Sequence, residues 1–143
     1  MFSLDPRLQQ DCIMVGDFPL CRLLLMNDVE FPWFILVPRR TDVSKLFQLE
    51  MADQQLLWQE TTALAETLKG SFAADKMNVA AIGNVVSQLH MHVIVRRRSD
   101  ALWPAPVWGK LPAQPYDAQQ LAVIGSKLRA ALSADFCFCE DVT

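Results

Sequence analysis

Two short apolar runs in the first third of the chain have the length and composition of β-strands. They cover residues 20–26 and 33–37, and the segment between them contains Asn27, Asp28 and Pro32. Asparagine, aspartate and proline favour turns, and apolar runs bounded by turn residues are typical of buried strands. We therefore predict that the two runs pair as antiparallel strands of a hairpin.

The next segment has the spacing of an amphipathic helix. The side chains that recur at helical spacing are Leu57, Thr61, Leu64 and Leu68. Such positions share one face of an α-helix, and Asp53 and Gly70 stand where this helix would begin and end. A second helix is predicted near the C-terminus, because Asp117 can act as its N-terminal cap. Its apolar stripe consists of Leu121, Ile124, Leu128 and Leu132.

Two further strand-like segments lie between the predicted helices. They cover residues 77–82 and 85–95, and Gly83 and Asn84 join them. The second segment is rich in β-branched residues and free of proline, which favours a strand. Residues 102–115 carry several prolines, which exclude regular structure, so we expect an ordered loop on the surface.

The predicted order of elements is strands, helix, strands, helix. No internal repeat, low-complexity tract or Gly/Ser-rich linker divides the chain, so we expect residues 1–143 to form a single domain. The order favours an α+β domain, in which an antiparallel sheet of about five strands carries two main helices on one side.

Composition and charge narrow the class of protein. Of the 143 residues, 52% are hydrophobic and 20% are charged, which is typical of a compact folded domain. The longest apolar run, residues 33–37, is far shorter than the ~20 residues of a membrane helix, and the N-terminus lacks the features of a secretory signal. A net charge of -3 is the wrong sign for binding nucleic acid through its phosphates. We therefore expect a cytoplasmic protein with no nucleic-acid or membrane partner.

The chain has only two histidines, His90 and His92. In a strand, side chains two residues apart emerge on the same face, so we expect Gln88, His90 and His92 to point together. The alternate side chains, which we expect to anchor the strand in the core, are Leu89, Met91 and Val93. Two histidines and an amide on one strand face indicate a functional pocket.

Two chemistries fit such a pair of histidines. Zinc sites need three or four protein ligands, so a metal site would require Cys137 and Cys139 to fold back onto the histidines. Alternatively, a neutral imidazole can attack phosphorus and form a phospho-histidine intermediate, which water then cleaves. Outside the zinc hypothesis, we expect most of the cysteines to be small core residues.

Arginines form the other candidate group. Arg96, Arg97 and Arg98 follow the second strand-like segment, and Arg39 and Arg40 follow the hairpin. If the fold brings the two groups together, they would form a positive edge that binds a small anion. Basic residues at separate strand ends would be solvated and carry no such role.

Residues 88–94, Gln-Leu-His-Met-His-Val-Ile, resemble the signature of the histidine-triad family. That signature is His-φ-His-φ-His-φ-φ, where φ is apolar, and glutamine stands here in place of the first histidine. Asn78, the turn at Asn84, the strand that ends in Pro38 and the downstream Trp103 are also similar to the family's layout. The resemblance implies a HIT-like fold and an enzyme that hydrolyses or transfers a nucleotidyl group. Its substrate would be attacked at the α-phosphate and would be a nucleoside phosphoramidate or a dinucleoside polyphosphate.

The resemblance also assigns roles to the three polar positions of the signature. His90 matches the family's nucleophile, which forms a nucleotidyl-His90 intermediate, and His92 matches the histidine that contacts the phosphate. In the family, the backbone carbonyl of the first position orients the nucleophile, and Gln88 supplies that carbonyl equally well. A glutamine side chain cannot titrate, however, so Gln88 is expected to differ from histidine in protonating the leaving group.

Four further residues match the family's nucleotide contacts. Asn27 and Asp28 fall where the family holds the ribose hydroxyls, and Asn78 falls near the ribose and phosphate. Asn84 keeps an amide where family members contact the phosphate region. Each of these residues has a simpler interpretation as well, because Asn-Asp pairs are common in turns and Asn78 can close a strand end.

The resemblance implies a small-molecule nucleotide as the substrate, no metal or other cofactor, and a homodimer. Trp103 and Trp108 are costly residues to place in a loop, so they either cover the domain's own core or reach a second subunit. A second interpretation of the function remains open. The protein would then bind a nucleotide for sensing or scaffolding, with little turnover.

Overall fold

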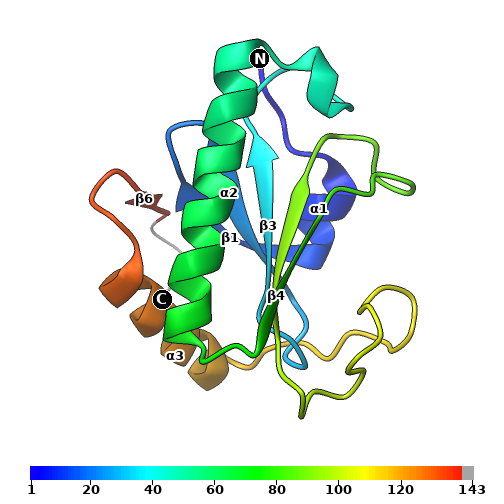
Figure 1. Cartoon of the computed structure of the whole chain (residues 1–143), viewed down its shortest axis with the longest axis vertical. Coiled ribbons are helices and arrows are strands. Elements are labelled where there is room, and N and C mark those ends of the chain that lie inside the picture. The colour runs from blue at the N-terminus through cyan, green and yellow to red at the C-terminus, as the bar shows by residue number, and fades with distance from the viewer. Residues whose placement is uncertain (140–143) are drawn as a thin grey trace.

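The computed structural model describes residues 1–139, which form an antiparallel β-sheet with helices packed against it (Figure 1). The sheet has six strands in the order β4-β5-β3-β2-β1-β6, and neighbouring strands are antiparallel. The strands are β1 (Cys12–Asp17), β2 (Cys21–Met26), β3 (Trp33–Pro38), β4 (Lys76–Ala80), β5 (Met91–Arg96) and β6 (Cys137–Phe138). The helices are α1 (Pro6–Asp11), α2 (Met51–Ser71), α3 (Ala118–Ala131) and the short 3-10 helix η1 (Leu46–Gln48). The expected α+β class is confirmed.

The hairpin and the two long helices lie where the sequence predicts them. Strands β2 and β3 pair with Leu24 opposite Ile35. Asp117 caps α3, because its side chain accepts a hydrogen bond from the Gln120 N–H at 2.8 Å. Within residues 1–139, no helix has both the length and the hydrophobicity that crossing a membrane requires.

The strand that contains the histidines is shorter than predicted. Residues 81–90 form a loop, and β5 begins only at Met91. The neighbouring strands explain the difference, because the ladder of β3 reaches β5 no further than the pair Leu36–Met91 and that of β4 ends at the pair Ala80–His92. Without a partner, β-branched residues do not form a strand. The prediction of a strand is therefore wrong for residues 85–90 and confirmed from Met91 onward.

Two strands that the sequence pattern does not predict complete the sheet. β1 extends the hairpin, and β6 pairs with β1 through Gly16 opposite Phe138. Glycine is required at this position, because a Cβ would collide with the carbonyl oxygen of Cys137 and the ring of Phe136. A strand as short as β6 carries too few residues to show the alternating pattern that prediction needs.

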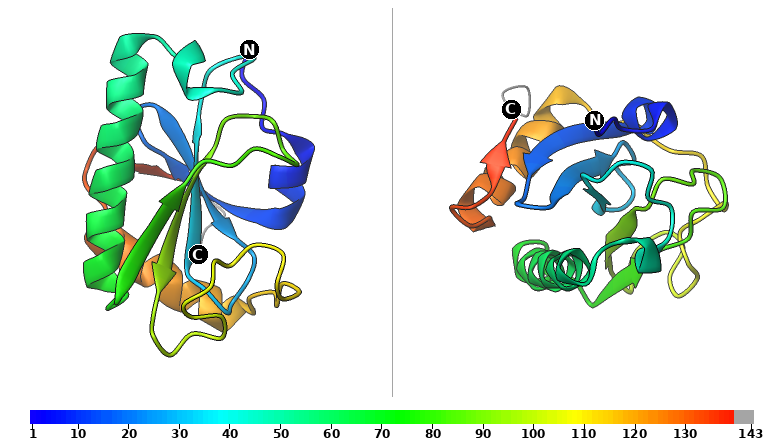
Figure 2. Two further views of the ribbon diagram at one scale, coloured as in Figure 1. Left: turned by 45° about the vertical axis from the view of Figure 1, so that its right-hand side comes forward. Right: turned by 90° about the horizontal axis from the view of Figure 1, so that it is seen from above.

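Side chains alternate between the two faces of the sheet and form two hydrophobic clusters. Leu23, Phe34 and Val93 belong to the cluster that also contains the inward residues of α2 and α3. On the opposite face, Ile35 packs in a second cluster with Leu8 of α1. Figure 2 shows α2 and α1 on opposite sides of the strands. The two main helices thus share one face, and the second face is left to α1 and the loop that follows β5.

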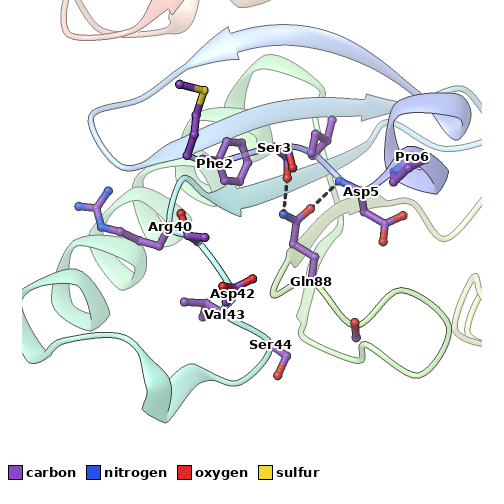
Figure 3. Close-up of a pocket in the computed structure, with 13 residues that line it drawn as sticks. Phe2, Ser3, Asp5, Pro6, Arg40, Asp42, Val43, Ser44 and Gln88 are labelled. Carbon is purple, nitrogen blue, oxygen red and sulfur yellow. Dashed lines mark hydrogen bonds between the residues drawn. The ribbon is translucent and has the colours of Figure 1, made fainter.

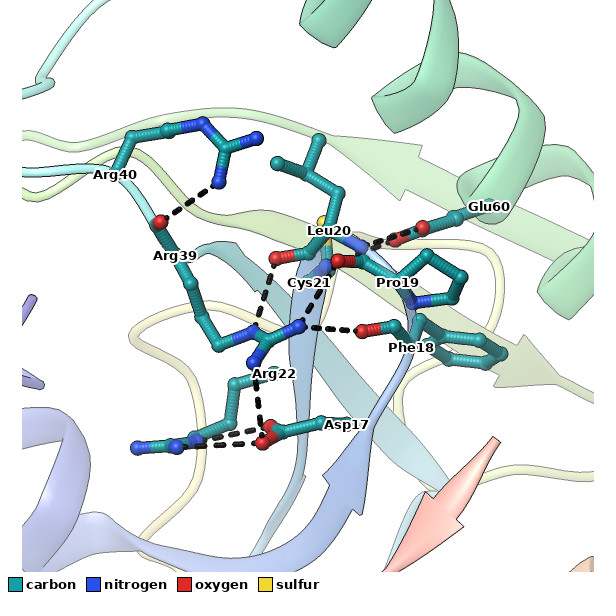
Figure 4. Close-up of polar contacts among 9 residues, drawn as sticks. All are labelled: Asp17, Phe18, Pro19, Leu20, Cys21, Arg22, Arg39, Arg40 and Glu60. Carbon is teal, nitrogen blue, oxygen red and sulfur yellow. Dashed lines mark hydrogen bonds and ion pairs between the residues drawn. The ribbon is translucent and has the colours of Figure 1, made fainter. Parts of the chain in front are cut away.

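A buried carboxylate fixes α2 to the start of β2 (Figure 4). The two carboxylate oxygens of Glu60 accept hydrogen bonds from the backbone N–H groups of Leu20 and Cys21, each at 2.9 Å. Burial and the neighbouring Glu60 charge raise the pKa of the Cys21 thiol far above its usual range. Cys21 therefore stays protonated and serves as a small core residue.

The arginines do not form one positive edge. Because β3 and β5 are antiparallel, Arg96 at the end of β5 lies near the start of β3, whereas Arg39 and Arg40 follow the end of β3. Arg39 donates hydrogen bonds to the carbonyl oxygens of residues 18–20 (Figure 4). Arg40 forms a bidentate pair with Asp53. The hypothesis of a joint anion site is wrong, since strand direction separates the two groups.

Candidate functional site

The structure brings the two histidines together on the face of the sheet that α1 covers. His92 lies in β5 opposite Ile35 of β3, and His90 immediately precedes the strand. The two rings meet edge to face, with their centroids 4.9 Å apart. Both side chains are buried, with 6% of His90 and 5% of His92 exposed. The alternate residues, which the sequence placed in the opposite core, are found there.

His90 is held in one orientation by its own loop. Its Nδ1 atom lies 2.7 Å from the backbone carbonyl oxygen of Gln88. A carbonyl oxygen can only accept a hydrogen bond, so this contact requires the proton of the ring on Nδ1. In the neutral imidazole, the lone pair is then on Nε2. Nε2 is thus the nitrogen of His90 that can act as a nucleophile.

His92 is held in the opposite tautomer. The indole Nε1–H of Trp33 donates to its Nδ1 atom over 3.0 Å, which leaves the ring proton on Nε2. Burial, with a smaller contribution from His90, lowers the pKa of His92 to about 4. At neutral pH the ring is therefore uncharged, and its Nε2–H is a hydrogen-bond donor. Together the two histidines offer a lone pair on Nε2 of His90 and a hydrogen-bond donor on Nε2 of His92.

Tryptophans form an aromatic wall behind His92. The ring of Trp108 lies 5.2 Å from the ring of His92 and 5.9 Å from that of Trp33, both nearly perpendicular. The Nε1–H of Trp108 is buried and has no hydrogen-bond partner among residues 1–139. Trp108 therefore covers the core of its own chain, which is one of the two alternatives that the sequence leaves open.

Arg96 fixes the loop that carries Trp108. Its guanidinium is 1% exposed, pairs with both carboxylate oxygens of Asp100 at 2.8 and 3.1 Å, and donates to the carbonyl oxygen of Ala105 at 2.8 Å. Phe31 and Trp103 lie 5.7 Å away, with the guanidinium over each ring. Burial raises the pKa of Asp100, but hydrogen bonds from Arg96 and from the backbone outweigh it and leave that pKa below its usual value. Arg96 is thus a structural residue, not an exposed anion site.

Asn27 and Asp28 lie at one end of the β3–β5 ladder, and His90 lies at the other. Oδ1 of Asn27 accepts from the Tyr116 N–H at 2.9 Å. Oδ1 of Asp28, a residue with 5% exposure, accepts from the Gln114 N–H at 3.3 Å. The two side chains therefore tie the segment before α3 to the turn between β2 and β3.

The other two predicted contacts lie on β4 and on the loop after it. Asn78 of β4 is opposite Ile94 of β5, and its Oδ1 atom accepts a hydrogen bond from Arg96 at 2.9 Å. Asn84 is exposed on the loop of residues 81–90, which also carries His90. The structure thus places Asn84 on the same loop as His90, and Asn78 beside the buried Arg96.

The side chain of Gln88 is held by the N-terminal segment. It precedes β5, where strand alternation no longer applies, and its amide bonds to the N-terminal segment (Figure 3). Oε1 accepts from the Asp5 N–H at 2.9 Å, and Nε2 donates to the Ser3 carbonyl oxygen at 2.8 Å. The amide of Gln88 is therefore occupied by its own chain, and the expectation that Gln88 points together with His90 and His92 stays a prediction.

Two cavities meet at Gln88. The larger, about 540 Å³, lies between residues 1–6, residues 40–44 and the Ser87–Gln88 segment, and does not reach His90 (Figure 3). The smaller, about 260 Å³, is lined by His90 together with residues 44–47 and 81–83. Of these two cavities, only the smaller is lined by His90.

The topology of the sheet excludes the zinc site that the sequence left open. Cys137 belongs to β6, which is at the opposite edge of the sheet from the β4–β5 pair. Across residues 1–139, no three His, Cys, Asp or Glu side chains are grouped closely enough to hold a metal ion. His90 and His92 therefore do not share a site with Cys137 or Cys139.

Several residues of the site were not predicted from the sequence. Trp33 contacts His92 because the register of β3 against β5 places the two on one face, and register is not visible in one sequence. The role of the N-terminal segment was also missed. The only signal there is Asp5 followed by Pro6, a pair typical of a helix start, which places α1 but not its contact with Gln88.

Comparison with known proteins gives a consistent result. Residues 7–99 match the family model described as the HIT domain. Histidine triad proteins from Marinobacter aquaeolei, Sinorhizobium meliloti and Bradyrhizobium japonicum have similar crystal structures, with sequence identities of 48%, 43% and 41% and a TM-score of 0.90 each. Each alignment covers 92% of this chain, and 96%, 98% and 98% of those proteins respectively. Among curated proteins, none matches the sequence.

Proposed function

Because the chain belongs to the histidine triad (HIT) family, we propose that it is an enzyme that hydrolyses or transfers a nucleotidyl group through His90. Membership of this family supports a nucleotide-binding hydrolase or transferase in general. As the substrate we propose a nucleoside phosphoramidate or a dinucleoside polyphosphate, attacked at its α-phosphate. One observation carries the proposal. The two rings are held in opposite tautomers, with a lone pair on Nε2 of His90 and a hydrogen on Nε2 of His92.

The proposed reaction has two steps at phosphorus. Nε2 of His90 attacks the α-phosphorus, and the bond to the leaving group breaks with its electron pair departing on the leaving atom. Water then attacks the phosphorus of nucleotidyl-His90, the P–N electron pair returns to Nε2, and the proton of the water is lost to solvent. In a transferase, another nucleophile replaces this water. Any proton that the leaving group needs comes from solvent, because Gln88 has none to give.

His92 supports both steps as a neutral donor. Its Nε2–H is proposed to bond a non-bridging oxygen of the phosphate, where negative charge builds up in the transition state. The donor is already oriented by Trp33, so it needs no reorganisation when the charge develops. Because the pKa of His92 is lowered to about 4, the ring keeps this tautomer throughout the neutral range.

The remaining predicted contacts are proposed to bind the nucleotide. Oδ2 of Asp28 accepts no hydrogen bond within the described part of the chain, so it is free for a ribose hydroxyl, with Asn27 beside it. Oδ1 of Asn78 is used by Arg96, which leaves its amide N–H groups for the ribose or the phosphate. Asn84 is exposed on the loop of His90 and is proposed to contact the phosphate.

The proposal is tested by turnover and by trapping the intermediate. The protein is incubated with adenosine 5'-phosphoramidate and with diadenosine polyphosphates, and released nucleotide is measured by chromatography. Rapid acid quenching followed by intact-protein mass spectrometry detects the nucleotidyl adduct. We expect release and an adduct with wild type and neither with His90→Ala. Equal release by the two proteins would contradict the role of His90.

A second candidate function is nucleotide binding with little turnover. It is favoured by Gln88, which cannot titrate and whose amide is already bonded to Ser3 and Asp5. In that case calorimetry would detect tight binding of a nucleoside monophosphate, while no substrate of either class would release nucleotide. The two experiments together separate a sensor from an enzyme.

We also propose that the protein is a homodimer. Within residues 1–139, β4 has no strand on its outer side, and the unpaired backbone groups of an edge strand favour pairing with another chain. Met51 and Trp58 of α2 and Val79 of β4 are exposed apolar side chains, at 66%, 61% and 41%. Sedimentation velocity should give a dimer, and Trp58→Glu should shift it towards the monomer. A wild-type protein that stays monomeric at high concentration would refute this assembly.

A further inference from the structure

The N-terminal segment, residues 1–6, is bonded to the loop that carries the nucleophile. Both ends of the Gln88 amide are used, one by the Asp5 N–H and one by the Ser3 carbonyl oxygen, which are 83 and 85 residues away in the sequence. A second tie follows at the start of α1, where Nη1 of Arg7 donates to the Val85 carbonyl oxygen at 2.9 Å. The N-terminal segment and the start of α1 therefore hold the loop at two points, of which Figure 3 shows the one at Gln88.

The backbone of Gln88 orients the ring of His90. The carbonyl oxygen of Gln88 lies 2.7 Å from Nδ1 of that ring. The next residue, Leu89, donates its N–H to the carbonyl oxygen of Val43 at 2.9 Å. The loop has no strand partner, because β5 begins at Met91. The direction of this carbonyl therefore depends on these individual ties and not on a sheet.

We infer that Gln88 is a positioning residue. Its two hydrogen bonds to Ser3 and Asp5, which we call the clasp, keep His90 in the tautomer and orientation needed for attack. The inference rests on the proposed function, because it takes His90 as the nucleophile. If the clasp is lost, only the hydrogen bond from the Leu89 N–H to the Val43 carbonyl oxygen holds the peptide of Gln88, and its carbonyl turns away from Nδ1 in part of the molecules. The ring proton then distributes over both nitrogens, and a smaller fraction of His90 presents its lone pair on Nε2.

Substitution of the side chain tests this inference without removing the carbonyl. Gln88→Met deletes both hydrogen bonds to the N-terminal segment and keeps the length of the side chain and the whole backbone. Gln88→Glu keeps the acceptor for the Asp5 N–H and loses the donor to Ser3, so its effect should be intermediate. Gln119→Met is the matched control, because Gln119 is exposed on α3.

The primary measurement reports on the ring and not on catalysis. Long-range proton–nitrogen NMR spectra distinguish ring nitrogens that carry a proton from those that do not. With two histidines in the chain, the spectrum contains two sets of signals. We expect a single Nδ1–H tautomer of His90 in wild type and in Gln119→Met, and a mixture of tautomers in Gln88→Met. His92 is an internal control for folding, because Trp33 holds it independently of the clasp.

Kinetics provide the second readout. Misorientation of a nucleophile lowers kcat, so we expect Gln88→Met to lose about tenfold or more in kcat with KM nearly unchanged. An unchanged His90 tautomer in Gln88→Met overturns the inference, whatever the activity. If the tautomer changes as expected but wild type has no turnover, the clasp stands and the proposed function fails.

A pair of variants in the N-terminal segment tests the same clasp from its other side. The φ angle of Asp5 is -55°, which proline can adopt, so Asp5→Pro removes the N–H that bonds Gln88. Asp5→Ala loses the same carboxylate cap of α1 but keeps this N–H. We expect the His90 signals of Asp5→Pro to resemble those of Gln88→Met, and those of Asp5→Ala to resemble wild type. Identical spectra for the two Asp5 variants would overturn the role of the segment.

Discussion

The indole N–H of Trp33 lies 3.0 Å from Nδ1 of His92, and this hydrogen bond decides which nitrogen of His92 is left for a ligand. The two residues are on neighbouring strands and face the same side of the sheet. A tryptophan N–H can only donate, so the facing ring nitrogen has to accept. The donor that His92 offers from Nε2 is thus a consequence of a residue that touches no substrate in the proposed mechanism.

Replacing Trp33 with phenylalanine should remove this control while keeping an aromatic ring. Nδ1 of His92 would lose its donor inside a buried site, so we expect a loss of about 1–3 kcal/mol in the free energy of unfolding. The NMR spectrum of His92 should change from one tautomer to two. Gln119→Met, on the exposed side of α3, is the control and should change neither quantity. A His92 that keeps a single tautomer in Trp33→Phe would show that another group holds it.

The stability of the protein should fall as the pH falls through the range in which only the unfolded state protonates His92. The pKa of His92 is about 4 in the folded protein, because of burial and then His90, against an ordinary value of 6.5. Between these values the unfolded state binds more protons, so acid favours unfolding. The contribution of His92 is complete above about pH 6.5 and is lost towards about pH 4, by about 2–3 kcal/mol.

Urea unfolding at several pH values measures this effect. The comparison of wild type with His92→Asn isolates His92 from the carboxylates, because asparagine does not titrate. The wild-type free energy should decline more steeply than that of the variant between about pH 6.5 and about pH 4. Parallel curves for the two proteins would mean that His92 titrates normally in the folded state.

The fold was predictable where the chain carries its own pattern. The β2–β3 hairpin, α2 and α3 follow from apolar spacing and from turn and capping residues such as Asp117. β5 was overextended because Val85 and Val86 favour strands, while the partner strands end before reaching them. Strand propensity is local, but a strand needs a neighbour, and one sequence does not show where that neighbour stops.

The candidate site was also predictable only in part. A single sequence shows local spacing, but it does not show which strands become neighbours. His90 and His92 come together because a spacing of two survives at the start of β5, where His92 is already in the strand. Gln88 lies outside the strand, where alternation no longer fixes the direction of a side chain, and its contact with Ser3 spans a long separation in the sequence. The contact between Trp33 and His92 depends on strand register. In a sheet that is buried on both faces, the hydrophobic pattern does not determine that register.

The buried pair of Arg96 and Asp100 should be essential for stability, in contrast to an exposed pair elsewhere. Asp100→Asn would leave the Arg96 charge uncompensated at 1% exposure, so we expect a loss of about 3 kcal/mol or more. The pair of Arg40 and Asp53 is the matched control, because Arg40 is 45% exposed, and Asp53→Asn should cost less than about 1 kcal/mol. Chemical denaturation of both variants gives the comparison. Similar losses for the two variants would contradict a structural role of Arg96 in the loop after β5.

Two substitutions of Trp108 should differ strongly in their effect on the free energy of unfolding. Its Nε1–H is buried without a hydrogen-bond partner in residues 1–139, and a buried donor left unbonded costs about 1–3 kcal/mol. Trp108→Phe removes this donor and keeps a ring beside His92, so the removed penalty should offset the lost ring volume and leave the free energy of unfolding within about 1 kcal/mol of wild type. Trp108→Ala removes the whole ring that contacts Trp33 and His92, and we expect the free energy of unfolding to fall by about 3–5 kcal/mol.

Thermal or urea unfolding of the two variants measures the difference. Sedimentation of both is the necessary companion, because a tryptophan that reached a second subunit would change assembly and leave the stability of the single chain intact. Trp108 packs against Trp33 and His92 of its own chain, so we expect Trp108→Ala to lose stability and to keep the oligomeric state of wild type. A variant that keeps its stability and loses its partner would place Trp108 at a subunit contact instead.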